Sequence, residues 1–293
     1  MTMAETPAGV TSKVTVERRG QIVLIGINRP SIHNRVDPET YLGLAKAYYQ
    51  YEHDASLRAA VLFGHGDNFS RGIDVDAFQA VAASGRSLPS DPEIIDPLAR
   101  TKGLSKPLVV AVHGDTWNMG HELHLVADIR IAAADTRFGQ DENTHGRFPG
   151  GGATVRFVRE AGWANAMRHM LTGDHWSAEE ALRMGVVQTI APTAEAALEA
   201  GVETATKIAA CGPLGIKATL ASAHLAIDAS ETEALSKLEA QYRALYGSED
   251  FKEGRKAEAE GRPPRLSGTM TGAPLELTVR FFNKRRCLES IRS

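Results

Sequence analysis

Cysteine is scarce in this sequence, with only Cys211 and Cys287 standing far apart from each other. A disulfide framework is therefore not expected, and this usage is typical of the reducing cytoplasm. Long apolar runs are also missing. No stretch approaches the roughly 18–20 apolar residues that span a membrane, and residues 1–16 lack the apolar run of a signal peptide. We therefore expect a cytoplasmic protein with no membrane segment.

Neither sign of charge dominates the composition. The chain carries 33 Lys and Arg against 36 Asp and Glu, a formal net charge of −3. This balance does not indicate nucleic acid or an anionic membrane surface as a partner. Apolar residues, by contrast, are plentiful, at 43% of 293 residues. That is enough for a sizeable core, in one large domain or two small ones.

Apolar runs and turn residues predict strands in the first two thirds of the chain and mostly helices in the last third, an α/β fold class. Strands are expected at residues 13–17, 22–25, 59–63, 108–112 and 186–190. Asp37 and Pro38 supply an N-cap and a first-turn proline, which predicts a helix to about residue 53. Further helices are expected at residues 154–160, after the capping box at 177–180, and at 193–210, 214–227, 230–246 and 248–260.

The chain is organised around residues 114–132. An apolar run stops at Gly114, and a segment of helical character with room for about two turns follows near Glu122. A strand that turns sharply into a short helix presents unpaired backbone N–H groups and the positive end of the helix dipole at one point. With a carboxylate one turn further on, this stretch is typical of a reaction centre.

A second carboxylate, Glu142, lies in a loop rich in Gly, Pro and Asn, where a structural carboxylate has little obvious role. Two carboxylates in one cleft perturb each other's proton affinity and can divide the roles of acid and base. The competing interpretation is that Glu122 and Glu142 are ordinary surface glutamates.

Other chemistries find weaker support. His121 and His124 are three residues apart, whereas the zinc motif on a helix needs four, so no metal site is expected. The glycines at 150–152 lack the Lys-Ser/Thr of a phosphate-binding loop. Ser70 has no Gly-x-Ser-x-Gly around it, so a serine hydrolase is not indicated.

Taken together and in order, the motifs resemble those of the crotonase superfamily of enoyl-CoA hydratases and isomerases. The resemblance runs from about residue 14 to 268. It rests on Asn28-Arg-Pro with His33-Asn34, Phe69-Ser-Arg-Gly-Ile-Asp74, Gly120-His-Glu-Leu with Ala127-Asp-Ile, Phe138-Gly-Gln-Asp-Glu142 with Pro149-Gly-Gly-Gly, Ser177-Ala-Glu-Glu-Ala-Leu-Arg-Met-Gly and Ser248-Glu-Asp-Phe-Lys-Glu-Gly.

The resemblance implies a crotonase-like spiral of ββα units with a helical C-terminal trimerisation region. On that basis we expect a spiral core over residues 1–192, a helical region over 193–268 and a basic tail over 269–293. The partner would be further copies of the chain, in a homotrimer or a dimer of trimers.

The resemblance also implies the chemistry. The backbone N–H groups of Ile73 and Met119 would hold a thioester oxygen as an enolate forms, and Glu122 and Glu142 would handle a water between them. Retention of both glutamates favours hydration of a 2-enoyl-CoA, with coenzyme A as part of the substrate and no separate cofactor. The residues expected around the substrate are Arg71, Gly72, Asp74, Trp117, Gly120 and Gly150.

Several positions depart from the family pattern. The glycine run before the first glutamate is Asn118-Met119-Gly120 here, after the bulky Trp117, and Arg71 stands where a small residue is common. Gly261 replaces a lysine and Leu266 an aromatic residue that meet coenzyme A in relatives. Arg71 and the cluster at 284–286 are candidates for binding the phosphates of coenzyme A or a carboxylate on the acyl group.

The competing functions are an enoyl-CoA isomerase, a C–C bond hydrolase of a diketone that recruits His121 or His145, and a non-catalytic acyl-CoA or RNA-binding protein.

Overall fold

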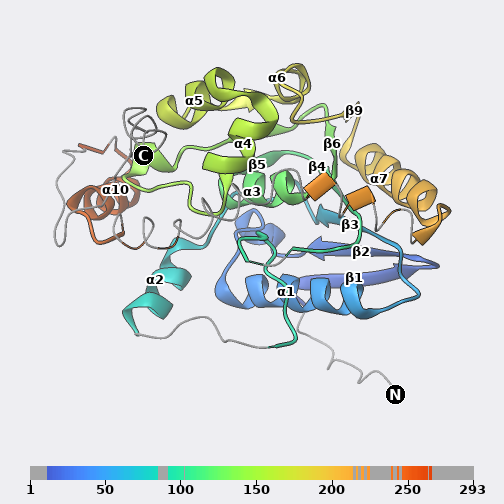
Figure 1. The fold of residues 1–293 in the computed structure, drawn as a ribbon. Helices are drawn as coiled ribbons and strands as arrows, with labels where there is room; N and C mark the ends of the chain where they lie inside the picture. The colour runs from blue at the N-terminus through green and yellow to red at the C-terminus, as the bar shows by residue number, and fades with distance from the viewer. Residues whose placement is uncertain are drawn as a thin grey trace, which may run out of the picture.

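The computed structural model describes residues 12–84, 92–101, 103–213, 246–262 and 264–265, with single positions at 216, 219, 220, 223, 224, 239 and 243. The fold is α/β and is built on a six-stranded sheet in the order β1-β2-β3-β4-β6-β9 (Figure 1). Its strands are β1 (Val14–Arg19), β2 (Ile22–Ile27), β3 (Ala59–Gly64), β4 (Leu108–Val112), β6 (Ile129–Ala133) and β9 (Thr189–Ala191). β1 is antiparallel to β2, and the later pairs are all parallel.

A second, three-stranded sheet has the order β5-β7-β8. Its strands are β5 (Asp115–Trp117), β7 (Arg137–Gly139) and β8 (Trp176–Ser177). β5 follows β4 directly through Gly114, so the small sheet starts where the large one ends. This step carries the chain into the short helix that bears Glu122.

The helices cover both faces of the large sheet. They are α1 (Pro38–His53), α2 (Val75–Ala83), α3 (Met119–Val126), α4 (Ala153–Ala161), α5 (Trp163–Thr172), α6 (Ala178–Arg183), α7 (Ala194–Ala209) and α10 (Glu249–Ala259), with the 3₁₀ turns η1 (Pro30–Ile32) and η2 (Glu142–His145). Because strand side chains alternate between faces, Ile25 packs with α1 whereas Leu24 packs with α7. Two apolar clusters therefore sandwich the sheet, and no described helix is both long and apolar enough to cross a bilayer.

The locally encoded elements are where the sequence predicted them. Asp37 caps α1 by accepting from the N–H of Thr40, and Ser177 caps α6 by accepting from Glu180. The hairpin of β1 and β2, the strand β3, the short helix α3 and the helices α4, α7 and α10 are likewise confirmed.

The predicted strand at residues 186–190 was wrong over its first half. Val186 and Val187 are buried, but their N–H groups donate to Ala181 at the end of α6. Bonds that close a helix are not available to a strand ladder, so β9 begins only at Thr189.

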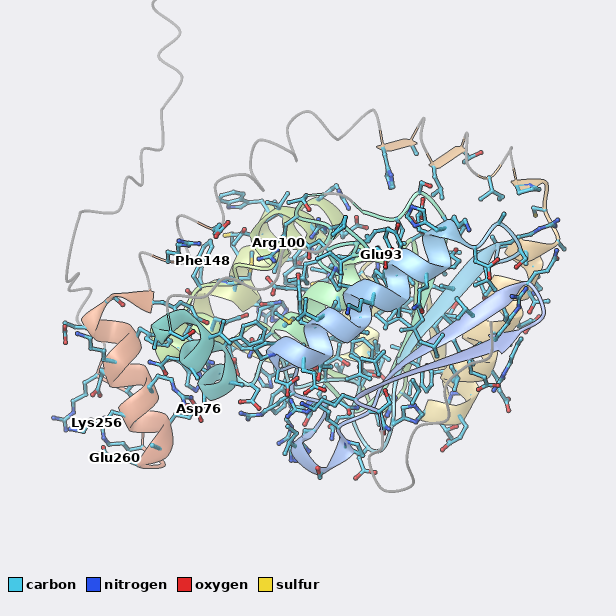
Figure 2. All side chains as sticks on the ribbon, turned by 90° about the horizontal axis from the view of Figure 1, so that it is seen from below. Asp76, Glu93, Arg100, Phe148, Lys256 and Glu260 are labelled. Carbon is cyan, nitrogen blue, oxygen red and sulfur yellow. The ribbon has the colours of Figure 1, made fainter. Side chains whose placement is uncertain are left out.

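The helix α10 returns to the site region from the far end of the described chain. It lies beside α2, where Arg255 pairs with Asp76 (Figures 1 and 2). Gly254 packs against the carbonyl of His145 so closely that a Cβ there would overlap it, which seats α10 on η2. The helices expected at 214–227 and 230–246, apart from single positions, and Leu266, the basic tail at 269–293 and its cluster at 284–286 lie outside the described residues.

Candidate active site

Gly114 makes the turn from β4 into the site. Its φ is +52°, and a Cβ would overlap the carbonyl oxygen of Asp67, so only glycine fits. β5 then pairs with β7, and the N–H of Trp117 donates to Ser70 at 2.9 Å. The start of α3 is thereby fixed against the loop at residues 70–73.

Ile73 and Met119 follow the two residues of the bond between Trp117 and Ser70, one on each segment. Val36 bridges the residues that flank Ile73, donating to Gly72 and accepting from Asp74, so the N–H of Ile73 faces away from Val36. Met119 is the first residue of α3, where an N–H has no acceptor within the helix. No acceptor among the described residues takes either N–H. Gly72, next to Ile73, lies close to the start of α3, since a Cβ on Gly72 would lie 3.5 Å from the nitrogen of Met119.

Glu122 is 3% exposed and points at the start of α4. Its Oε1 accepts from the N–H groups of Gly151 at 2.7 Å and Ala153 at 3.2 Å. Burial raises the pKa of this carboxyl above its ordinary value, and the two N–H groups, together with the charges of Arg100 and Arg156, limit the rise. The glycine run is needed here, because a Cβ on Gly151 would overlap the carboxylate.

Glu142 begins η2 and is 8% exposed. Burial first, and then the negative charge of Glu122, raise its pKa well above the ordinary value. Its Oε2 is buried and has no hydrogen-bond partner among the described residues. The structure therefore brings the two predicted glutamates into electrostatic contact, and excludes the interpretation that they are ordinary surface residues.

This arrangement separates the two carboxyls chemically. Glu122 has two N–H donors and two nearby arginines, all of which favour its anion. Glu142 has no such donors on Oε2, and burial and the charge of Glu122 favour its protonated form, outweighing a backbone bond and the charge of Arg147. One carboxylate and one carboxylic acid in a shared buried place can accept a proton on one side of a reacting group and deliver one on the other.

The remaining predicted residues lie around the same loop. Gly120 contacts the carbonyl of Ser70 so closely that a Cβ would overlap it. The guanidinium of Arg71 pairs with Asp115 at 2.6 Å and lies 4.7 Å above the ring of Trp117. Asp74 caps α2 by accepting from Ala77 at 3.3 Å, and Gly150 immediately precedes the Gly151 that holds Glu122.

Sequence reasoning missed the groups that support Glu122. Arg156 binds the carbonyls of Gly151 at 3.4 Å and Ala99 at 2.9 Å, and Arg100 acts on Glu122 through its charge. Figure 2 labels Arg100 on the segment beside α1. No local pattern could have identified Arg100, because it comes from a segment 22 residues before Glu122 in the chain, a separation of 122 − 100.

The histidines of α3 lie in the core. His121 is fully buried and its ring meets those of Phe138, Phe157 and Trp176 at 5.8, 4.9 and 5.1 Å. Burial, with the charge of Arg130, lowers the pKa of His121 to about 3. This placement speaks against its recruitment by a C–C bond hydrolase. His145, the other candidate, faces Thr144 and the carbonyl of Asp141. No group of three or more His, Cys, Asp or Glu among the described residues could hold a metal ion.

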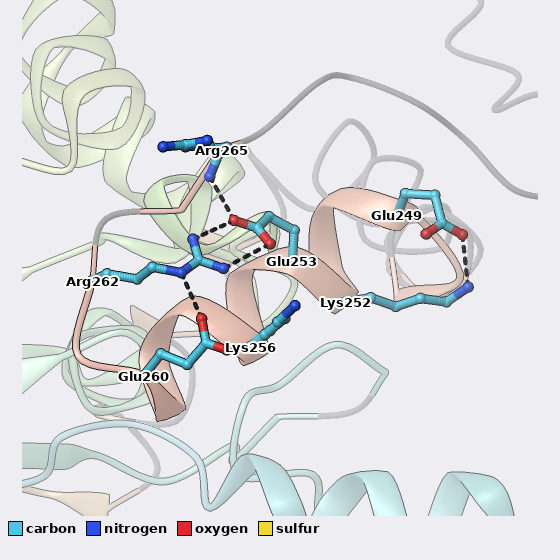
Figure 3. Close-up of a pocket in the computed structure, with 7 residues that line it drawn as sticks. All are labelled: Glu249, Lys252, Glu253, Lys256, Glu260, Arg262 and Arg265. Atoms are coloured by element: carbon cyan, nitrogen blue, oxygen red, sulfur yellow. Dashed lines mark hydrogen bonds and ion pairs between the residues drawn. The ribbon is translucent and has the colours of Figure 1, made fainter.

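An open hollow of about 690 Å³ lies along α10, and neither glutamate lines it (Figure 3). Much of its charge is neutralised internally: Arg262 pairs with Glu253 and Glu260, and Lys252 pairs with Glu249. The lining residues are Glu249, Lys252, Glu253, Lys256, Glu260, Arg262 and Arg265. Neither of the two glutamates nor either of the two backbone donors lines this hollow, so it is not formed by the groups of the candidate active site.

The chain is similar to known proteins over most of its length. The sequence model of one family, described as enoyl-CoA hydratase/isomerase, matches residues 17–269. The chain is similar to enoyl-CoA hydratase EchA19 of Mycobacterium tuberculosis (34% identity, 86% of this chain and 95% of the relative). It is also similar to the 2,3-dehydroadipyl-CoA hydratase of Escherichia coli (30% identity, 88% and 99%). Among solved structures, a probable enoyl-CoA hydratase/isomerase from Mycobacterium abscessus matches with a TM-score of 0.71 and 41% identity, over 88% of this chain and 99% of the other.

Proposed function

Since the chain belongs to the enoyl-CoA hydratase/isomerase family, we propose that it adds water across the 2,3 double bond of a 2-enoyl-CoA. The observation that carries the proposal is the buried pair of Glu122 and Glu142, beside two backbone N–H groups with no acceptor of their own. An isomerase needs to move one proton between two carbons, whereas hydration needs a base for water and an acid for carbon. The unequal environments of the two carboxyls match the second requirement.

The reaction would proceed as follows. The Glu122 carboxylate takes a proton from water while the water oxygen bonds to the β-carbon, and the electrons of the double bond move onto the thioester oxygen. The N–H groups of Ile73 and Met119 stabilise that enolate, a role in which one donor is typically worth about 3–4 kcal/mol. Glu142 then gives its proton to the α-carbon. Return of a proton from Glu122 to Glu142 through solvent restores the starting state.

A panel of thioesters and ketones tests this function. The purified protein is incubated with 2-enoyl-CoAs, 3-enoyl-CoAs and free diketones, and each product is identified by mass. Hydration adds one water to a 2-enoyl-CoA, isomerisation leaves the mass of a 3-enoyl-CoA unchanged, and hydrolysis splits a diketone. Turnover of only the second or third class would replace the proposal by the corresponding activity.

The fold of a family member also leads us to propose the crotonase-like spiral and a homotrimer or dimer of trimers. The supporting observation is apolar surface on α5 and α6, where Trp163 is 71%, Leu171 69% and Leu182 44% exposed. We expect light scattering at micromolar concentration to give three or six times the mass of the chain. A stable monomer would contradict this assembly.

Arg71 gives a prediction about the substrate. If its guanidinium meets coenzyme A, Arg71→Ala should raise KM to a similar extent for every acyl chain, because that contact is the same in the ground and transition states. If it reads the acyl group, only acyl chains with a carboxylate should lose affinity. We expect the coenzyme A role, even though the ion pair with Asp115 partly neutralises the guanidinium of Arg71. Steady-state kinetics on neutral and carboxylated 2-enoyl-CoAs distinguish these outcomes, and unchanged kinetics throughout would leave Arg71 without a binding role.

A further inference from the structure

Asn118 has a backbone conformation that L-residues rarely adopt. Its φ is 52° and its ψ is −119°, outside the regions that hard-sphere contacts allow to a residue with a Cβ. Such a conformation costs on the order of 1–3 kcal/mol and persists only where the surroundings fix it. The residue that follows is Met119, whose N–H is one of the two proposed enolate donors. The direction of that N–H depends on the peptide that joins the two residues.

Asp141 supplies the contacts that fix Asn118. The side-chain amide of Asn118 donates to Asp141 Oδ1 at 2.9 Å, and the backbone N–H of Asp141 donates to Asn118 Oδ1 at 3.0 Å. The backbone of Asn118 is held as well, because its N–H donates to Gly139 at 2.8 Å and its carbonyl accepts from Gln140 at 3.1 Å. Every polar group of Asn118 is thus bonded to the segment that ends at Asp141.

The Asp141 carboxylate is itself held from a third element. Its Oδ2 faces His175 Nε2 at 3.0 Å, and the ring of His175 lies 4.6 Å from that of Trp117. Burial raises the pKa of Asp141, but the bonds from His175 and Asn118 outweigh burial and leave it lower than usual, so the group is an anion with two partners. Asp141 is also the residue before Glu142. One side chain therefore connects the start of α3, the small sheet and the second glutamate.

We propose that Asp141 is a positioning residue that holds Asn118 in its strained, positive-φ conformation and thereby aims the N–H of Met119 at the substrate oxygen. This inference rests on the proposed function for its substrate and deepens it. The family resemblance implies glycine at position 118, and glycine adopts a positive φ without a Cβ penalty. In this chain the Asn118–Asp141 contact stabilises a positive φ that glycine would adopt without support.

The test compares variants of Asp141 in the native sequence and in an Asn118→Gly background. Asp141→Ala removes the acceptor, and we expect kcat to fall about 10–100-fold with little change in KM, because a displaced donor affects the transition state most. Asp141→Asn keeps an oxygen for Asn118 and a group for His175, so it should stay within about threefold of the native enzyme. In the Asn118→Gly background the same Asp141→Ala change should cost less than about threefold relative to Asn118→Gly alone, because glycine needs no support.

Two further readouts separate positioning from general damage. A 2,4-dienoyl-CoA absorbs at longer wavelength when donors polarise its carbonyl, so the shift on binding should shrink in Asp141→Ala and persist in Asp141→Asn. Hydrogen–deuterium exchange of the peptide covering residues 117–122 needs no substrate and should quicken in Asp141→Ala. Glu160→Gln, which disturbs the partly buried pair with Arg130 outside the site, is the matched control and should change neither readout.

Equal losses from Asp141→Ala in both backgrounds, or unchanged exchange at residues 117–122, would overturn the role of Asp141. Failure of the native protein to hydrate any 2-enoyl-CoA would instead overturn the proposed function. The exchange experiment still decides the role of Asp141 in that case, so the two failures can be told apart.

Discussion

Glu122→Gln and Glu142→Gln are each expected to lower kcat for hydration by about 10²–10⁴-fold while the fold stays intact. Glutamine keeps the shape of the side chain and can still accept from the N–H groups of Gly151 and Ala153, so the contact between α3 and α4 survives. What is lost is the ability to take up or give a proton. Loss of the enoyl absorbance measures turnover, and circular dichroism measures folding.

Two controls accompany the Glu122 and Glu142 variants. Glu160→Gln changes a partly buried glutamate outside the site and should leave kcat within about threefold of the native value, as substitutions that do not touch reacting groups do. Because the two glutamates act as a unit, the double variant should lose far less than the product of the single losses. Near-native rates in either single variant would contradict the two-glutamate mechanism.

A shift in the titration of Glu142 is a further consequence of removing Glu122. Burial and the charge of Glu122 both raise the pKa of Glu142, and Glu122→Gln removes the second cause only. The pKa of Glu142 should therefore fall in that variant but stay above the ordinary value. As pH rises, Glu142 loses the proton that it must deliver, and activity falls. In a pH–rate profile, this alkaline decline should begin at a lower pH for Glu122→Gln than for the native enzyme.

Elements with local signals were predictable from the sequence. Asp37 followed by Pro38 fixes the start of α1 through bonds among neighbouring residues, and Ser177 does the same for α6. The stretch around Glu122 was predictable for the same reason, since a strand, a turn and a short helix are encoded within 20 residues. The part of the site that this stretch carries was therefore visible in the sequence.

The rest depends on contacts between distant segments. β5, β7 and β8 have only two or three residues each, which is too short for a periodic pattern, and they form because Ser70 and Gly114 bring their partners together. The Asn118–Asp141 contact joins residues 23 apart and is visible only once β5 lies beside β7. Val186 and Val187 have the composition of a strand, but the end of α6 takes their backbone bonds.

Gly120→Ala is expected to lower kcat/KM about 10²–10³-fold, close to the loss of an enolate donor. A Cβ at this position would overlap the carbonyl oxygen of Ser70 and lie 3.0 Å from the Ser70 Cβ. That carbonyl accepts from Trp117 at 2.9 Å, so it cannot rotate away without breaking a backbone bond. The start of α3 must move instead, and it carries the N–H of Met119 away from the loop that bears Ile73.

Gly43→Ala is the matched control, because it also adds a methyl group to a helical glycine in a tight place. There the Cβ would lie 2.9 Å from Val14 Cγ2 and 3.4 Å from Val14 Cβ, so the crowding falls on a side chain outside the site rather than on a backbone carbonyl. Both variants should be assayed for kcat and KM on one 2-enoyl-CoA, at a temperature well below the melting temperature of each. A Gly120→Ala enzyme that stays within about threefold of Gly43→Ala would show that the Met119 N–H does not depend on the contact between α3 and Ser70, because a donor displaced by about 1 Å should cost on the order of 100-fold.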